Sequence, residues 1–213
     1  MVLVSETPLN TANQSQLSGR IGPNSVLQLE AALKEFGGAP AARSVFSLAR
    51  LSHLLDDRPG DMVDEAIPRA LFTTLFECLP RPKAAKIAHR AGELTGDYIL
   101  KHRIPGAACR LLKALPPRFA APLLLKAIQK HAWTFVGSGI CGTSSGLPSK
   151  ITIENNPLAM PNCAWHVGVF EALFQNLVSP ATQIVHRRHC SATGDPICSF
   201  SIHTPPCHSE VKP

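Results

Sequence analysis

The chain has few aromatic residues, few charges and no long apolar run, and each shortage argues against a class of protein. Only 6% of its 213 residues are Phe, Trp or Tyr, whereas proteins that bind single-stranded nucleic acid stack bases on such rings. Charged residues make up 17% and hydrophobic residues 45%, which argues against a disordered chain or a coiled coil. The longest apolar stretch, around 120–128, is interrupted by Pro122 and Lys126, and about 20 apolar residues are needed to cross a bilayer. We therefore expect a folded domain without a transmembrane segment.

The usual signs of a bound redox cofactor or nucleotide are also missing. No phosphate-binding lysine loop and no H-E-x-x-H metal motif occurs. The glycine-rich run 137–142 is a weak dinucleotide candidate because no predicted helix follows it, and we interpret it as a loop. No NAD or flavin site is recognised, and this favours a non-enzymatic protein over an enzyme.

The cysteines are odd in number and occur without a secretory signal. The first residues, 1–5, carry no Lys or Arg and too few apolar side chains for such a signal. Seven cysteines in a chain of this kind favour free thiols or metal ligands over a disulfide framework. We therefore expect a cytoplasmic protein.

Positive charge is concentrated in the middle of the chain. The segment 81–130 holds eleven basic residues against two acidic ones, whereas 50–77 is net negative. Nucleic acid is not favoured as a partner, because 81–130 offers only Tyr98 and Phe119 for base stacking. The remaining interpretations are a solvated helical face, an anionic small ligand or an anionic membrane surface.

Hydrophobic periodicity predicts helices first and strands last, and therefore an α+β fold. Helices are expected over 24–36, 41–55, 62–79 (capped by Asp61), 83–103, 107–114, 118–129 and 163–177. Strands are expected over 132–136 and 151–154, with a loop over 137–148, and a hairpin is expected between 182–190 and 197–203. The predicted domains are a flexible tail (1–20), a helical arm (21–80), a ligand-binding domain (81–204) and a C-terminal tail (205–213).

Two glycines lie four residues apart in the clearest amphipathic helix. Gly92 and Gly96 each cost about 1 kcal/mol of helix propensity relative to Ala. This cost predicts the close approach of another backbone or of a flat ligand.

Three cysteines near the C-terminus have the spacing of a metal site. Cys190 and Cys198 stand on the two arms of the predicted hairpin, and Cys163 begins the preceding helix. Three thiolates with one imidazole would suit structural zinc. His186 shares a strand face with Cys190, and His166 and His189 are the other candidates for the fourth position. The alternative is a set of ordinary half-buried thiols.

The same region carries a longer pattern. It contains Cys163-Ala-Trp-His-Val-Gly168, then Ile184-Val-His-Arg-Arg-His-Cys190, then Gly194-Asp-Pro-Ile-Cys-Ser-Phe200. This pattern resembles the C-terminal signature of the 4-vinyl reductase domain family, which is related to trafficking-complex subunits and to ligand-sensing regions of transcription activators. The chain most resembles the bacteriochlorophyll-biosynthesis members of that family.

The resemblance implies a ligand and a metal. A tetrapyrrole would lie in an apolar pocket enclosed by helices and a twisted sheet, against Gly92 and Gly96 and near Trp133, with its Mg held by His102 or His131. Zinc-binding sensor members of the family use the positions of Cys163, Cys190 and Cys198. They also carry a Glu where this chain has Arg187, which leaves the fourth ligand open.

Three functions follow from the resemblance. The first, which the missing cofactor motifs favour, is a carrier or accessory protein that binds a Mg-tetrapyrrole of the bacteriochlorophyll pathway in photosynthesis. The second is the 8-vinyl (4-vinyl) reductase of a divinyl chlorophyllide, and the third is a small-molecule sensor. Expected partners are other pathway enzymes and a second copy of the chain, with peripheral association with the photosynthetic membrane as an alternative to a purely cytoplasmic location.

Overall fold

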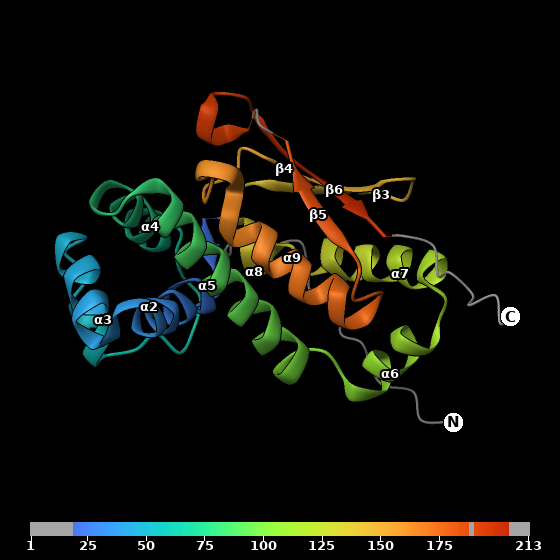
Figure 1. The fold of residues 1–213 in the computed structure, drawn as a ribbon, viewed down its shortest axis with the longest axis horizontal. Helices are drawn as coiled ribbons and strands as arrows, with labels where there is room; N and C mark the ends of the chain where they lie inside the picture. The colour runs from blue at the N-terminus through green and yellow to red at the C-terminus, as the bar shows by residue number, and fades with distance from the viewer. Residues whose placement is uncertain (1–18, 188–189, 205–213) are drawn as a thin grey trace, which may run out of the picture.

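The computed structural model describes residues 19–187 and 190–204, and its α+β architecture confirms the predicted fold class. Two helical regions flank a central pair of helices, and a four-stranded antiparallel sheet lies on one side of that pair (Figure 1). The predicted tails, 1–18 and 205–213, lie outside the described residues.

The first helix, α2 (Asn24–Leu48), bends sharply where the sequence predicts a stop. Gly38 adopts a φ of 69°, which separates two helical halves at Gly37 and Gly38. The second half ends at Leu48 rather than at 55, because Arg50 has a φ of 58°. A short helix, α3 (His53–Asp56), follows.

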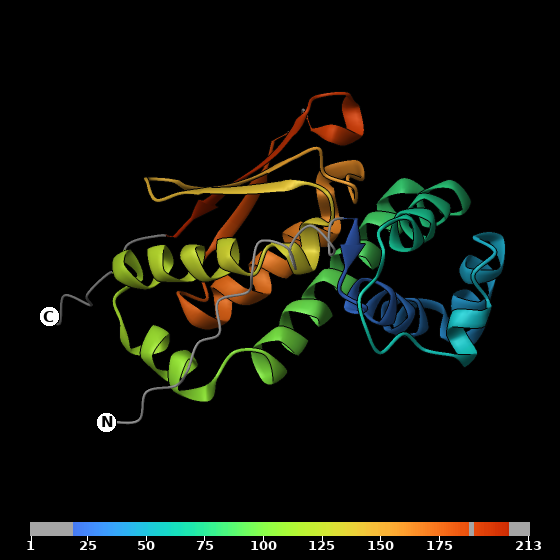
Figure 2. The same cartoon turned by 180° about the vertical axis from the view of Figure 1, so that it is seen from behind.

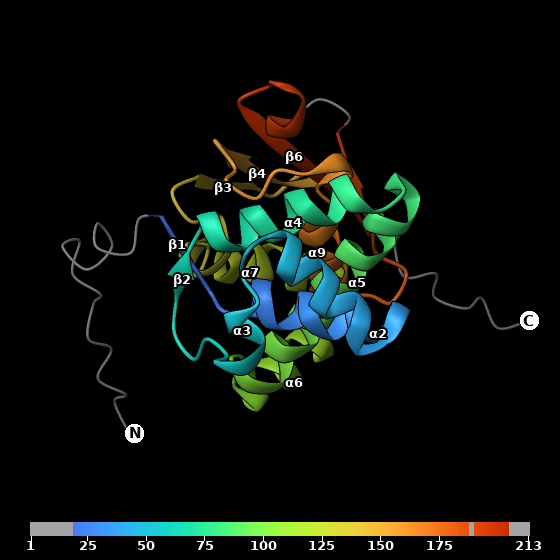
Figure 3. The ribbon, with the colours of Figure 1, turned by 90° about the vertical axis from the view of Figure 1, so that its left-hand side faces the viewer.

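The helix predicted over 62–79 begins later than expected. Strand β2 (Val63–Asp64) pairs with β1 (Arg20–Ile21), and helix α4 (Ala66–Cys78) starts after it. The carboxylate of Asp64, rather than that of Asp61, accepts the Ala66 N–H at 2.8 Å. Figure 3 looks onto α2, α3 and α4 from the arm end of the molecule.

Helix α5 (Arg81–His102) confirms the amphipathic prediction and packs along α9 (Ala164–Leu177). The two backbones approach closely at glycines. A Cβ on Gly92 would lie 2.1 Å from the Trp165 carbonyl oxygen, and a Cβ on Gly96 would lie 2.5 Å from the Ala172 Cβ. Gly168 provides the reciprocal position on α9, where a Cβ would lie 2.2 Å from the His89 carbonyl.

The helices α6 (Gly106–Ala114) and α7 (Pro117–Lys130) confirm the sequence prediction, but the strand predicted over 132–136 is wrong. That segment forms a short helix, α8 (Trp133–Val136), which buries Phe135 and Val136. The strand preference of its aromatic and β-branched residues is overridden by tertiary packing. The Thr134 carbonyl accepts the N–H of Gly22, which ties α8 to β1.

The main sheet has the strand order β3-β4-β6-β5, and all its pairs are antiparallel. Its strands are β3 (Ile140–Ser144), β4 (Ser149–Glu154), β5 (Gln183–His186) and β6 (Ile197–His203). The predicted hairpin is confirmed by the β5–β6 pairing, whereas β3 occupies a segment that was predicted as loop. Helices α9 and α7 lie along one face of the sheet (Figures 1 and 2).

One hydrophobic core joins the sheet to the helices. Its largest fully buried side chains include Trp165, Phe170 and Phe174 of α9 and Phe200 of β6. Phe170 meets Phe200 edge to face, with ring centroids 5.2 Å apart. Among the described residues, no helix combines the length and apolar character needed to cross a bilayer.

Candidate metal centre and ligand-contact residues

The structure brings together the four residues that the sequence nominated for a metal. One potential ligand atom from each of Cys163, His186, Cys190 and Cys198 lies within 4.8 Å of all the others. The Cys163 sulfur is 3.5 Å from that of Cys198 and 4.0 Å from that of Cys190. All three thiols are buried.

Unusual backbone at the start of α9 points Cys163 toward this cluster. Asn162 has a φ of 60° and Cys163 has a φ of 42°, so two consecutive residues with side chains occupy the left-handed region. Each such residue costs on the order of 1 kcal/mol, less for Asn, and such strain persists only where the surroundings enforce it. The strained backbone therefore suggests that the position of the Cys163 thiol serves a function.

The turn before β6 positions the other two sulfurs. A short 3-10 turn (Ser191–Thr193) follows Cys190, and Gly194 then takes a φ of 90°. The Cys190 carbonyl accepts N–H groups from Thr193 and Asp195, at 2.8 and 3.1 Å. The Asp195 carboxylate accepts the Ile197 N–H and so starts β6, which places Cys198 opposite Ile153 of β4.

Sequence reasoning missed Asn156, which lies against the cluster. Its amide nitrogen is 3.5 Å from the Cys198 sulfur and 4.0 Å from the Cys163 sulfur. The Leu158 N–H donates to the amide oxygen at 3.0 Å, which fixes the NH₂ group toward the sulfurs. An N–H donor aimed at sulfur stabilises thiolate. Asn156 follows the left-handed Asn155 just after β4, so only the tertiary fold reveals its role.

The cluster favours ionisation of one thiol over the others. The hydrogen bond from Cys163 lowers the pKa of Cys198, against the opposing effect of burial, and His186 and Ser191 lower it further. The same hydrogen bond, with burial, raises the pKa of Cys163, and burial raises that of Cys190. Without a cation, the three sulfurs therefore cannot all be thiolates at neutral pH.

The donor set fits zinc. A tetrahedral ion with Zn–S bonds of about 2.3 Å separates its sulfurs by roughly 3.8 Å, close to the two separations observed from Cys163. His186 has a buried Nε2 without a hydrogen-bond partner among the described residues. Three thiols and an imidazole are a common ligand set for structural zinc.

Of the other two imidazole candidates for the fourth position, His166 lies outside the cluster and His189 lies outside the described residues. His166 is fully buried among Phe135, Trp165, Phe170 and Phe200, and burial lowers its pKa to about 4. Its Nε2 lies 3.4 Å from the Phe135 carbonyl, so it is a neutral core residue outside the four-residue cluster.

The residues predicted to contact a tetrapyrrole are spread over the molecule. The faces of Gly92 and Gly96 that lack a side chain are filled by α9, so the close approach predicted there is that of a backbone and leaves no room for a flat ligand. His102, at the end of α5, is exposed and lies 4.7 Å from the Tyr98 ring. His131 is exposed after α7, and Trp133 is half-buried in α8.

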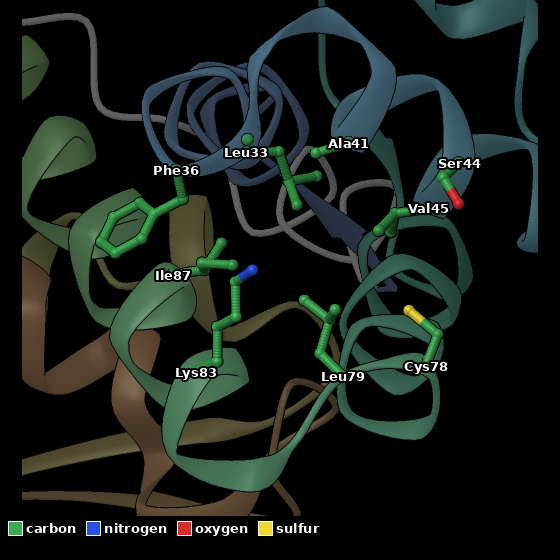
Figure 4. Close-up of a pocket in the computed structure, with 10 residues that line it drawn as sticks. Leu33, Phe36, Ala41, Ser44, Val45, Cys78, Leu79, Lys83 and Ile87 are labelled. Carbon is green, nitrogen blue, oxygen red and sulfur yellow. The ribbon is translucent and has the colours of Figure 1, made fainter.

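Two hollows stand out in the described part of the chain. One, of about 130 Å³, lies between α2, α4 and α5, with Leu33, Leu79 and Ile87 directed into it (Figure 4). It is smaller than the roughly 300–1,000 Å³ of typical ligand pockets. The other, of about 540 Å³, is a wide hollow at one end of the sheet, and its lining residues are Leu147, Pro148, Ala181, Gln183, Ile202, His203 and Thr204.

Two glycine patterns in the β3 region do not form the sites they resemble. Residues 137–142 run from the end of α8 into β3, the reverse of the strand-to-helix order in dinucleotide sites. Residues 142–146 read G-x-S-x-G, but they lie at the end of β3 in a hairpin, whereas a nucleophile elbow joins a strand to a helix. The β3–β4 hairpin explains both patterns.

The fold and the cluster define an α+β domain in which three buried cysteines and one half-buried histidine lie together. No known family profile matches the chain. It is 39% identical over 207 residues to the bacteriochlorophyll synthase 23 kDa chain of Cereibacter sphaeroides, covering 90% of this chain and 97% of the relative. It is 38% identical over 190 residues to the protein of the same name from Rhodobacter capsulatus, covering 86% and 87%. The chain therefore belongs to the bacteriochlorophyll synthase 23 kDa chain family, and its role lies in bacteriochlorophyll biosynthesis.

Proposed function

We propose that this protein binds a Mg-tetrapyrrole intermediate of the bacteriochlorophyll pathway and acts as a carrier or accessory subunit. The observation that carries this proposal is the similarity, over nearly the whole chain, to two proteins named as chains of bacteriochlorophyll synthase. In the proposed role, this chain would hold an apolar pigment and present it to pathway enzymes. The resemblance of residues 163–200 to the 4-vinyl reductase domain supports a tetrapyrrole as the ligand.

The hollow at the end of the sheet is the best-sized place for the pigment. Its volume of about 540 Å³ falls within the usual range for small-molecule sites. Leu147 and Pro148 offer apolar contact, and the exposed imidazole of His203 can ligate the pigment's Mg in its neutral form. We therefore add His203 to His102 and His131 as candidate Mg ligands.

Zinc in the cysteine cluster would have a structural part in this function. It would join the start of α9 (Cys163), the end of β5 (His186) and the β5–β6 hairpin (Cys190 and Cys198). Strand β6 (Ile197–His203) connects Cys198 to His203, which lines the hollow. A fixed cluster would therefore set the position of the rim.

The test is an absorbance titration with divinyl protochlorophyllide. We expect a saturable shift of the pigment band, and we expect His203→Ala to weaken binding by roughly tenfold while His102→Ala and His131→Ala leave it unchanged. Loss of the shift in His102→Ala or His131→Ala would instead identify that histidine as the Mg ligand. A pigment spectrum unchanged at every protein concentration would refute the proposal.

A further inference from the structure

The helix α7 carries an exposed stripe that no other part of the described structure covers. Phe119, Leu123, Lys126 and Lys130 recur at helical spacing on the side opposite the buried Leu124 and Ile128. Phe119 is 52% exposed and Leu123 is 45% exposed, and such a grouping of exposed apolar side chains on one helix face, unlike a single one, indicates an interaction surface.

The neighbouring helix α6 extends this character. Leu111 is 58% exposed, and it lies between Arg110 and Lys113, which are also exposed. Both helices lie at the end of the molecule opposite α3 (Figures 1 and 2). The stripe on α7 together with the exposed side chains of α6 is called the basic–apolar face below.

The charged residues of α6 and α7 have one sign. The sequence contains no Asp or Glu from 98 to 153, a stretch that holds eight Lys and Arg residues. In the described residues, none of the ion pairs involves a basic residue of α6 or α7. Arg118 instead lies over the Phe119 ring, 4.8 Å from its centroid. These cations are available to an external anion.

We propose that the basic–apolar face docks onto the surface of an anionic lipid bilayer. Helices that lie in a membrane interface combine basic residues with exposed Phe and Leu, because the cations meet anionic headgroups while the apolar side chains enter the acyl boundary. An RNA or a purely acidic protein surface would use the cations but would leave the aliphatic side chains of Leu111 and Leu123 without apolar partners. This inference depends on neither zinc nor pigment.

Sedimentation with vesicles tests the proposal. The full chain is mixed with phosphatidylcholine vesicles that contain no anionic lipid or about 30% phosphatidylglycerol, at low and at high salt. We expect binding to the anionic vesicles only, and weaker binding as salt screens the cations. The variant Leu123→Ser with Lys126→Glu should bind at least about tenfold more weakly, because one inserted side chain and one cation are lost and an anion is gained.

A matched variant on the opposite end of the molecule controls for general effects. Leu48→Ser with Arg43→Glu also removes an exposed apolar side chain and reverses a charge, on α2. It should bind vesicles as the parent does, and circular dichroism melts should show all three proteins folded. Equal loss in both variants, no binding to anionic vesicles, or binding to single-stranded RNA without vesicle binding would each overturn the proposal.

Discussion

At the scale of single residues, the absence of a side chain at Gly92 and Gly96 allows α5 to pack closely against α9. Gly92 and Gly96 were singled out by their helix-propensity cost, and the structure shows a backbone in close contact with each. Asn156 could not be found in this way, because nothing in its local sequence indicates that its amide faces two sulfurs 7 and 42 residues away. The helix-propensity cost of a residue can be predicted from the sequence, whereas its contacts in the tertiary fold cannot.

Gly92→Ala should destabilise the protein by about 2 kcal/mol or more. The new methyl group would meet the Trp165 carbonyl at 2.1 Å, and this backbone clash exceeds the gain of about 1 kcal/mol in helix propensity. Gly106→Ala, at the start of α6, has its nearest neighbour at 3.8 Å and should be neutral or stabilising. Urea unfolding of both variants measures the difference. Equal effects would show that α5 and α9 do not pack as described.

His89 makes stability depend on pH. Its Nε2 lies 2.7 Å from a Glu171 carboxylate oxygen, and its Nδ1 lies 3.6 Å from one of Glu93. The hydrogen bond to Glu171 and, to a lesser extent, the two negative charges raise the pKa of His89 above its usual 6.5. Stabilisation from this group is thus complete below about pH 6.5 and is lost as pH rises through the folded-state pKa.

The His89→Gln variant tests this pH dependence. The loss of unfolding free energy relative to the parent should be larger at pH 6 than at pH 8.5, as measured by urea unfolding at both values. His166, whose low pKa acts in the opposite direction, is common to both proteins and cancels in the comparison. A loss that is the same at both pH values would contradict the assignment.

Asn156→Ala should weaken zinc binding without removing a ligand. Loss of a hydrogen-bond donor to a metal ligand commonly lowers metal affinity by about 10–100-fold. Competition with a chromogenic chelator measures this, and Asn176→Ala, on the far end of α9, serves as the control. Unchanged affinity would mean that the Asn156 amide does not act on the sulfurs.

At the scale of elements, periodicity predicted the helices well and the short strands poorly. Helices α5, α6 and α7 have amphipathic patterns that specify them locally, and α9 is a long apolar segment that is buried on most sides. The segment 132–136 has strand-forming residues but lies in a helix. Strand β3 lies within the Gly- and Ser-rich segment 137–148 and is paired along one side only, with β4. Both outcomes depend on partners that local sequence does not contain.

Cys190→Ser and Cys198→Ser should each release zinc and loosen the β5–β6 hairpin. A loss of about 2–4 kcal/mol in a chain of this size lowers the melting temperature by roughly 5–15 °C. Cys78→Ser, at an exposed position outside the cluster, should retain both zinc and stability. Elemental analysis and thermal melts provide the readouts. Equal melting temperatures, with no zinc in the parent protein, would refute the metal centre.

At the scale of the whole molecule, one continuous core links the arm helices to the sheet, and α5 contacts both α2 and α9. The cysteine cluster lies where the start of α9 meets the β5–β6 hairpin. The wide hollow borders one end of the sheet, and the basic–apolar face occupies α6 and α7. The clustering of Cys163, His186, Cys190 and Cys198 could be predicted because thiols have specific chemistry and their spacing on the predicted hairpin is visible in the sequence. The hollow was not foreseen, because three separate segments line it.

The most direct measurement of the proposed carrier function follows bound pigment in the presence of a reductant. The protein is loaded with divinyl protochlorophyllide, NADPH is added without oxygen, and the pigment is then extracted and separated by chromatography. A carrier should give a saturable absorbance shift on loading and return the divinyl pigment unchanged. Conversion to the monovinyl pigment would establish a reductase and contradict the carrier assignment, and the absence of any shift on loading would contradict pigment binding itself.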